Sequence, residues 1–186
     1  MRRAQVINAA ADVLREVGTS EFTPAAVARR AGLARSSIYQ YYPSTEALLG
    51  AGVTALLQRS RDRVLNAVSG AGSPAERVAA YVRASWADAA EGHGSLAELA
   101  HLRMPDQLRA GVRELHTQLL GPLESALVDA QVPDPATAAV LVQGLVGAGV
   151  AAVRRGASQD RFVDATVEFV LLGLGLVAQD NRLSPR

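Results

Sequence analysis

The chain has 186 residues, 49% of them hydrophobic and 4% aromatic, which is enough to bury a sizeable core in one or two small domains. It contains no cysteine, which excludes a disulfide framework and any site that depends on a thiolate. The formal net charge of +1 does not indicate a general polyanion binder, but residues 1–63 carry nine arginines against five acidic residues. Unless this excess is ordinary surface scatter, it indicates an anionic partner for the N-terminal end alone.

The first eighteen residues predict an amphipathic helix. Apolar side chains recur every three or four residues, at Ile7, Ala10, Leu14 and Val17, and Gly18 ends the pattern. Charged residues interrupt the stretch that a signal peptide would keep apolar. No secretion signal is therefore expected, and we expect a cytoplasmic protein.

Two short helices around a glycine come next. Thr23 can cap a helix whose first residue is Pro24, because proline has no N–H group to leave unpaired at that position. Gly32 suits the end of that helix, where a positive φ angle is common. The small Ala28, the glycine in the turn and an inward-facing Ile38 together predict a helix-turn-helix.

The remaining start and stop signals also indicate helices. Ser44 is expected to open a long fourth helix, the sequence SGAGS at 69–73 breaks the pattern, and SPAE at 73–76 is a capping box. Pro122, after a glycine, should kink or split a later helix, and Asp134 followed by proline should start another. Because no alternating strand pattern occurs in the sequence, we predict an all-α protein of about nine helices.

The outer face of the short third helix is rich in hydrogen-bonding side chains. With Ile38 turned inward, this face is formed by Arg35, Ser36, Ser37, Tyr39 and Gln40. Arginine suits the O6 and N7 atoms of guanine, glutamine suits adenine, and hydroxyl groups suit either. The pattern predicts a helix that enters a major groove of DNA, and the alternative is a solvated helical hairpin with tyrosines in its core.

The segment TPAAVARRAGLARSSIYQYYPSTEALL, residues 23–49, resembles the DNA-binding region of the TetR family of transcriptional regulators. The resemblance covers roughly residues 5–50. It implies a three-helix helix-turn-helix DNA-binding head at 1–48 and a helical effector-binding and dimerisation domain at 49–186. It also implies a homodimer that binds an inverted-repeat operator in double-stranded DNA, with half-sites about one helical turn apart.

The same resemblance assigns DNA contacts by position. Thr23 and the two tyrosines Tyr39 and Tyr41 are expected near phosphates or a thymine methyl group, and Tyr42 is expected in the core. Two positions depart from the family pattern: Ala34 stands where a serine often opens the recognition helix, and Thr45 stands where a lysine usually contacts phosphate. The DNA-binding positions that follow are Thr23, Arg35, Ser36, Ser37, Tyr39, Gln40, Tyr41 and Thr45.

Residues 136–153 carry no charge and must be buried on nearly every side, by membrane or by protein. A second apolar stretch, 169–178, is too short to span a bilayer. We therefore favour a homodimer interface over a membrane hairpin, which would explain the same residues. The expected interface residues are Val140, Gly144, Gly147, Ala151, Val170, Leu174 and Val177.

The sequence says less about an effector. Scarce aromatic residues favour a small to medium apolar pocket, and the candidate residues are Trp86, His101, Met104, His116 and Gln143. Each of these is individually as well explained by a place in the core or on the surface. The resemblance implies a repressor that a small apolar molecule releases from its operator.

Other function classes remain open at this stage. The chain offers no metal-spaced ligands, no glycine-rich phosphate loop and no nucleophile–base pair, so no enzyme, metal or cofactor is expected. The alternative function is a helical scaffold or a membrane-associated adaptor without DNA binding, and detergent-dependent solubility would favour it.

Overall fold

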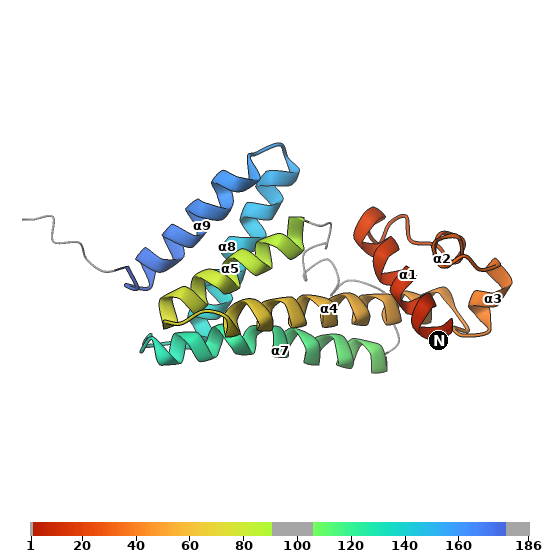
Figure 1. The fold of residues 1–186 in the computed structure, drawn as a ribbon, viewed down its shortest axis with the longest axis horizontal. Helices are drawn as coiled ribbons and strands as arrows, with labels where there is room; N and C mark the ends of the chain where they lie inside the picture. The colour runs from red at the N-terminus through yellow and green to blue at the C-terminus, as the bar shows by residue number, and fades with distance from the viewer. Residues whose placement is uncertain (1, 91–105, 178–186) are drawn as a thin grey trace, which may run out of the picture. The chain divides into compact units, whose positions relative to one another are not determined.

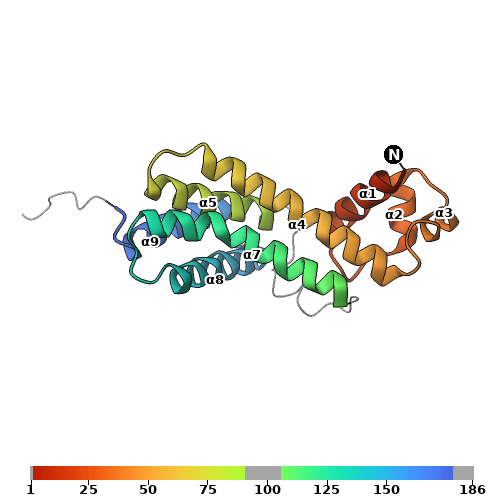
Figure 2. The ribbon, with the colours of Figure 1, turned by 90° about the horizontal axis from the view of Figure 1, so that it is seen from below.

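The computed structural model describes residues 2–90 and 106–177, and within these residues every regular element is a helix. The chain divides into two compact units, which Figures 1 and 2 show as ribbons. Eight helices are described: α1 (Arg2–Val17), α2 (Pro24–Ala31), α3 (Arg35–Tyr39), α4 (Thr45–Ser69), α5 (Pro74–Ala90), α7 (Asp106–Asp129), α8 (Pro135–Arg154) and α9 (Gln159–Gly173). The prediction of an all-α fold is confirmed.

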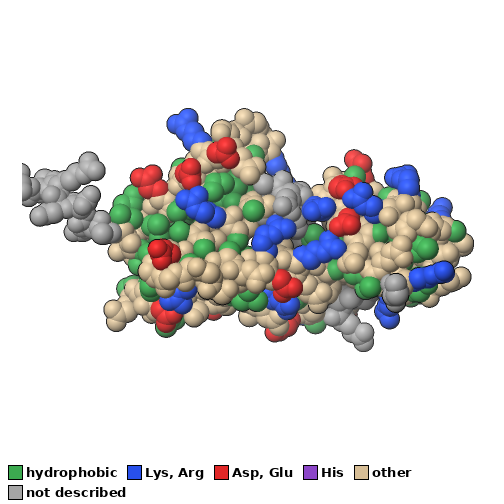
Figure 3. All heavy atoms as spheres, viewed as in Figure 1, with side chains coloured by type: hydrophobic (Ala, Val, Ile, Leu, Met, Phe, Trp, Pro, Cys, Tyr) green, Lys and Arg blue, Asp and Glu red, His purple; other side chains and the backbone are tan. Residues whose placement is uncertain are grey.

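The first unit combines Met1–Arg63 with Ala87–Leu119, and its N-terminal part is a three-helix head followed by most of α4. In this head α1 packs on α2, and α2 packs on α3. The core beneath them contains Val27, Ile38 and Leu48, none of which is more than 1% exposed. Arginine and acidic side chains lie among one another on the face of this unit that Figure 3 shows.

The buried side of α1 is wider than the sequence pattern predicted. Val6, Ala10 and Leu14 are buried, whereas Ile7 is only half-buried and Val17 is 39% exposed. The reason is that α1 is covered from two directions, by α2 and by α4. A Cβ atom at Gly52 of α4 would lie only 2.9 Å from Leu14 Cδ1 and 3.1 Å from Ala10 Cβ, so the two helices approach closely there.

The second unit combines Val64–Trp86 with Leu120–Arg186. It contains the end of α4, most of α5, the second half of α7, and the pair α8 and α9, which pack on each other. The predicted capping box is formed: Ser73 Oγ accepts from Glu76 N at 3.2 Å, and Glu76 Oε2 accepts from Ser73 N at 2.8 Å. Helix α7 contains Pro122 without being divided, so the expected split does not occur.

The two compact units do not follow the predicted division at 48/49, because most of α4, up to Arg63, belongs to the same unit as the head. The predicted division was a functional one, between a DNA-binding head and an effector-binding domain, and it stays a prediction. What the structure adds is that α4 up to Arg63 is part of the compact body that carries α1, α2 and α3.

Candidate nucleic-acid interface and effector region

The turn between α2 and α3 is fixed at both ends of α2. The backbone of Thr23 is extended, and its hydroxyl oxygen accepts a hydrogen bond from Ala26 N at 3.1 Å. At the other end Gly32 has a φ angle of 64°, which lets the Leu33 N–H group reach the Ala28 carbonyl at 2.9 Å. These local bonds set the direction in which the chain enters α3.

Helix α3 presents one side to the core and the opposite side to solvent. Ile38 is 1% exposed and anchors the helix. The predicted base-reading residues Arg35, Ser36 and Gln40 are exposed, and Ser37 is half-buried. Three of these four predicted side chains are therefore accessible to solvent, and their contacts with DNA stay a prediction. Helix α3 starts without a side-chain cap because its N-cap residue is alanine.

The three tyrosines that follow one another near the end of α3 have different surroundings. Tyr39 is 43% exposed, Tyr41 is half-buried and Tyr42 is only 5% exposed. The exposed and half-buried rings can contact a ligand, whereas Tyr42 is part of the core, as predicted. Its hydroxyl group is buried and has no hydrogen-bond partner among the described residues.

Sequence reasoning did not find a contact between the start of α1 and the turn that follows α3. The Arg3 guanidinium carbon lies 5.5 Å from the centre of the Tyr42 ring, at a distance typical of a cation–π interaction. This contact holds a positive side chain near the third helix. No spacing rule relates residues 3 and 42, so the sequence alone carried no signal for it.

The start of α4 forms the other edge of this surface. Thr45, the first residue of α4, is half-buried, and the preceding Ser44 accepts a hydrogen bond from Ala47 N at 3.1 Å. Hydrogen bonds from its own backbone N–H and from Ser44 hold the pKa of Glu46 below its usual value. An acidic side chain, Glu46, therefore already lies at the positive N-terminal end of the α4 dipole. Thr45 adds no charge at this end.

Comparison with known proteins agrees with this geometry. Residues 6–51 match the family model described as "Bacterial regulatory proteins, tetR family". This stretch of the chain is therefore similar to regulators of the TetR family. Curated relatives are the HTH-type transcriptional regulators BetI of Rhizobium meliloti, 36% identical over 86 residues, and BetI of Klebsiella pneumoniae, 37% identical over 84 residues. These names agree with the prediction that the protein is not an enzyme.

The alignments with these two relatives cover less than half of each protein. The alignment with the Rhizobium protein covers 46% of this chain and 42% of that relative, and the alignment with the Klebsiella protein covers 44% and 43%. The chain thus matches less than half the length of these TetR-family relatives.

Solved structures agree with the fold over nearly the whole chain. A putative TetR-family transcriptional regulator from Rhodococcus sp. is 17% identical, with a TM-score of 0.76, and the alignment covers 93% of this chain and 98% of that one. FadR from Bacillus subtilis, solved in complex with stearoyl-CoA, is 18% identical, with a TM-score of 0.71 and coverage of 94% and 99%. At these identities the similarity shows the TetR-like fold and nothing about ligands.

Two of the predicted effector residues lie in the second unit, Trp86 in its core and Gln143 half-buried on α8. Trp86 is 1% exposed, and its indole ring packs so closely on Gly149 that a Cβ atom there would overlap it. The side-chain amide of Gln143 donates a hydrogen bond to the hydroxyl of the fully buried Tyr81. The Trp86 N–H group is buried without a partner among the described residues.

The other effector candidates are not placed by the structure. His101 and Met104 lie outside the described residues, and so does the side chain of His116, although its backbone belongs to α7. A groove of about 770 Å³ opens on the second unit and contains none of the predicted residues. It is lined by parts of α4, α5 and α7, including Leu65, Arg77 and Pro122, and Arg77 pairs with Asp129 at 2.8 Å.

Tyr81 gives the second unit a pH dependence that can be measured. Burial raises the pKa of Tyr81 to about 12, so its neutral form is favoured in the folded state. The stability from this group is complete below the pKa of the unfolded state, near 10, and is lost as the pH rises toward 12. We expect the free energy of unfolding to fall by about 2–3 kcal/mol over this range.

The measurement is denaturant unfolding at several pH values, with the variant Tyr81→Phe beside the wild type. The variant should show a shallower decrease between pH 10 and 12. Equal slopes in the two proteins would mean that Tyr81 is not the group responsible.

The predicted dimer residues lie on α8, on α9 and just after α9, and they differ in exposure. Three of them are exposed: Val140 (64%), Val177 (41%) and Gly144. Gly147, Ala151 and Leu174 are half-buried, and Val170 is only 3% exposed. Val170 therefore packs inside its own unit. Further apolar side chains on the two helices are also open to solvent, namely Leu141, Leu145, Phe169 and Leu172.

Helix α8 is the one described helix that is long and apolar enough to cross a membrane by length and composition. This is weak evidence, because the core helix of a soluble protein passes the same test. Val142, Val146 and Val150 of this helix are buried, whereas Val140, Leu141 and Leu145 are exposed, so part of its apolar surface is uncovered in the single chain.

Proposed function

We propose that the chain is a ligand-responsive transcriptional regulator that binds a specific DNA sequence through α3. The observation that carries this proposal is the burial pattern of α3 and its C-cap: Ile38 is 1% exposed, while Arg35 and Gln40 are exposed. These are side chains that form two hydrogen bonds with guanine and adenine in a major groove. The curated relatives, named as HTH-type transcriptional regulators, support the same activity.

The protein acts as a homodimer in this proposal. The exposed Val140 and Leu141 of α8 and Phe169 of α9 form an apolar surface that a second copy would cover. A two-fold dimer presents two α3 helices, which fits an inverted-repeat operator in double-stranded DNA. A cytoplasmic location follows from binding bacterial DNA.

A small apolar effector releases the protein from its operator in this proposal. The regulator FadR of Bacillus subtilis, whose fold this chain shares, was solved in complex with stearoyl-CoA, which supports binding of some ligand but is a larger and more polar molecule than the effector proposed here. Effector binding among the C-terminal helices would move α4 and thereby oppose DNA binding. In this proposal the DNA-bound form represses, and the effector relieves the repression.

A membrane-associated adaptor without DNA binding is the second candidate, and the observation that favours it is the length and hydropathy of α8. The two candidates differ in a simple measurement. A regulator remains in solution without detergent and shifts duplex DNA in an electrophoretic assay, whereas an adaptor sediments with lipid vesicles and leaves the duplex unshifted.

The base-reading role is tested by Arg35→Ala and Gln40→Ala. Each variant should lose about 1–3 kcal/mol of discrimination at one or two base pairs and keep its stability, because both side chains are exposed. The measurement is binding to a set of duplexes that differ at single positions. Arg155→Ala, which removes an exposed arginine at the end of α8, is the control and should leave the preference unchanged. Equal weakening on every duplex would contradict base reading.

A further inference from the structure

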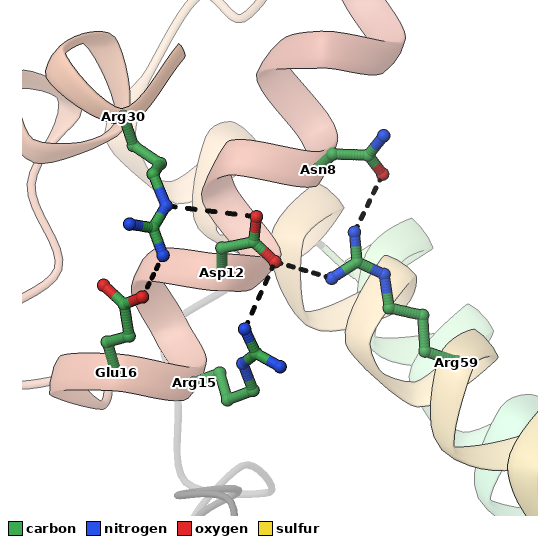
Figure 4. A network of polar contacts seen from close by, with 6 residues as sticks. All are labelled: Asn8, Asp12, Arg15, Glu16, Arg30 and Arg59. Carbon is green, nitrogen blue, oxygen red and sulfur yellow. Dashed lines mark hydrogen bonds and ion pairs between the residues drawn. The ribbon is translucent and has the colours of Figure 1, made fainter.

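A cluster of charged side chains joins three helices of the first unit on a side of the head where no predicted base contact lies. It is formed by Asn8, Asp12, Arg15 and Glu16 of α1, Arg30 of α2 and Arg59 of α4, and we refer to it as the Asp12 clamp (Figure 4). Asp12 is its centre, because side chains from all three helices reach its carboxylate. The proposed base-reading surface of α3 uses none of these residues.

The strongest contact in the clamp holds α4 to α1. Arg59 Nη1 lies 2.8 Å from Asp12 Oδ1, and Arg59 Nη2 donates to Asn8 Oδ1 at 3.0 Å. Asn8 and Asp12 are one helical turn apart, so they present two oxygens to one planar guanidinium group. Two parallel hydrogen bonds of this kind fix the orientation of the arginine as well as its distance.

A second contact fixes the same two helices at another level. Gly52 of α4 approaches Ala10 and Leu14 so closely that a side chain would overlap them. Positions 52 and 59 are seven residues apart, a rise of about 10 Å along the helix. One contact would let α4 pivot on α1, whereas two contacts at different levels set the angle between the helices.

Asp12 also ties α2 into the clamp. Arg30 Nε lies 4.0 Å from Asp12 Oδ2, and the other end of the Arg30 guanidinium pairs with Glu16. Arg15 Nη2 lies 4.0 Å from Asp12 Oδ1. Three arginine side chains thus gather around Asp12, so neutralising it removes a negative charge that lies between them.

From this geometry we infer that Asp12 is a positioning residue for DNA recognition, which fixes the angle of α4 relative to the head that carries α3. The inference rests on the proposed function, since the position of α3 matters only if α3 reads DNA. The clamp touches no base-reading residue, so it acts through the orientation of the helices. A change in the angle between α4 and the head then moves α3 together with the rest of the head.

The test compares Asp12→Asn with Glu21→Gln. Both changes remove one negative charge from the head, and Glu21 is exposed between α1 and α2. Long-range attraction to DNA phosphates should therefore rise equally in both variants. We expect Glu21→Gln to bind the duplex selected by the wild type at least as tightly as the wild type does, and Asp12→Asn to bind it about tenfold more weakly.

Orientation is measured directly by the distance between two spin labels. The chain has no cysteine, so labels can be attached at Ala25→Cys on α2 and Gln58→Cys on α4, both of which are exposed positions. We expect one narrow distance distribution in the wild type and in Glu21→Gln, and a broadened one in Asp12→Asn. Arg59→Gln, which removes the other partner, should broaden it in the same way and provides the test if Asp12→Asn does not fold.

The outcomes separate this inference from the proposed function. If the wild type selects no duplex from a random pool, the proposed function fails. The spin-label distances test the clamp separately: an unchanged distance distribution in Asp12→Asn and Arg59→Gln would refute it. If the wild type binds DNA but Asp12→Asn binds like Glu21→Gln, Asp12 has no positioning role. Weaker binding together with a broadened distribution supports it.

Discussion

Replacement of Ile38 by alanine is expected to lower the free energy of unfolding by about 2–5 kcal/mol and to abolish specific DNA binding. Ile38 is 1% exposed and is the one residue of the five-residue helix α3 that is buried. A helix this short has little stability of its own, so its place depends on that anchor. Thermal unfolding and duplex binding of the same preparation give both effects.

A graded control separates loss of the anchor from general damage. Ile38→Val keeps most of the buried side chain and should cost only about 0.5–1.5 kcal/mol. It should retain the sequence preference of the wild type. The account of α3 would be contradicted by an Ile38→Ala protein that unfolds at the wild-type temperature and still selects the same duplex.

A charge placed on α8 is expected to convert the homodimer into monomers. Leu141 is 64% exposed in the single chain, on the apolar surface proposed to meet a second copy. An unpaired carboxylate buried in such an interface costs roughly 3–5 kcal/mol, a loss of about two to four orders of magnitude in dimer affinity. Leu141→Glu should therefore sediment as a monomer at concentrations where the wild type is a dimer.

The matched control is Val128→Glu. Val128 lies on α7 and is 59% exposed, so the change in charge and in exposed apolar area is similar, but the site is on neither α8 nor α9. It should leave the dimer intact. If both variants sediment like the wild type, the subunit interface lies elsewhere on the chain.

The beginnings and ends of the helices could be predicted from the sequence because they depend on residues close together in the chain. Thr23 caps α2 and Gly32 ends it, and the box formed by Ser73 and Glu76 starts α5, as their spacing indicated. The exposed face of α3 follows in the same way, since placing Ile38 in the core leaves its neighbours outside. These inferences need only local geometry.

Features that depend on partners distant in the sequence could not be predicted. Val17 continues the apolar pattern of α1 but is exposed, since the side of α1 that is buried depends on where α2 and α4 lie. Arg59 meets Asp12 across 47 residues, and no periodicity relates them. Val170 was expected at the subunit interface and is buried within its own unit, because periodicity does not distinguish a protomer core from an interface.

Selection of bound duplexes from a random pool tests the central claim most directly. If the outer face of α3 reads bases in a dimer, the selected sequences should contain an inverted repeat with half-sites about one helical turn apart. Arg35→Ala should then change the preferred bases within each half-site. A pool that remains random after repeated selection, or one whose preferred bases are the same for the wild type and Arg35→Ala, would contradict the account.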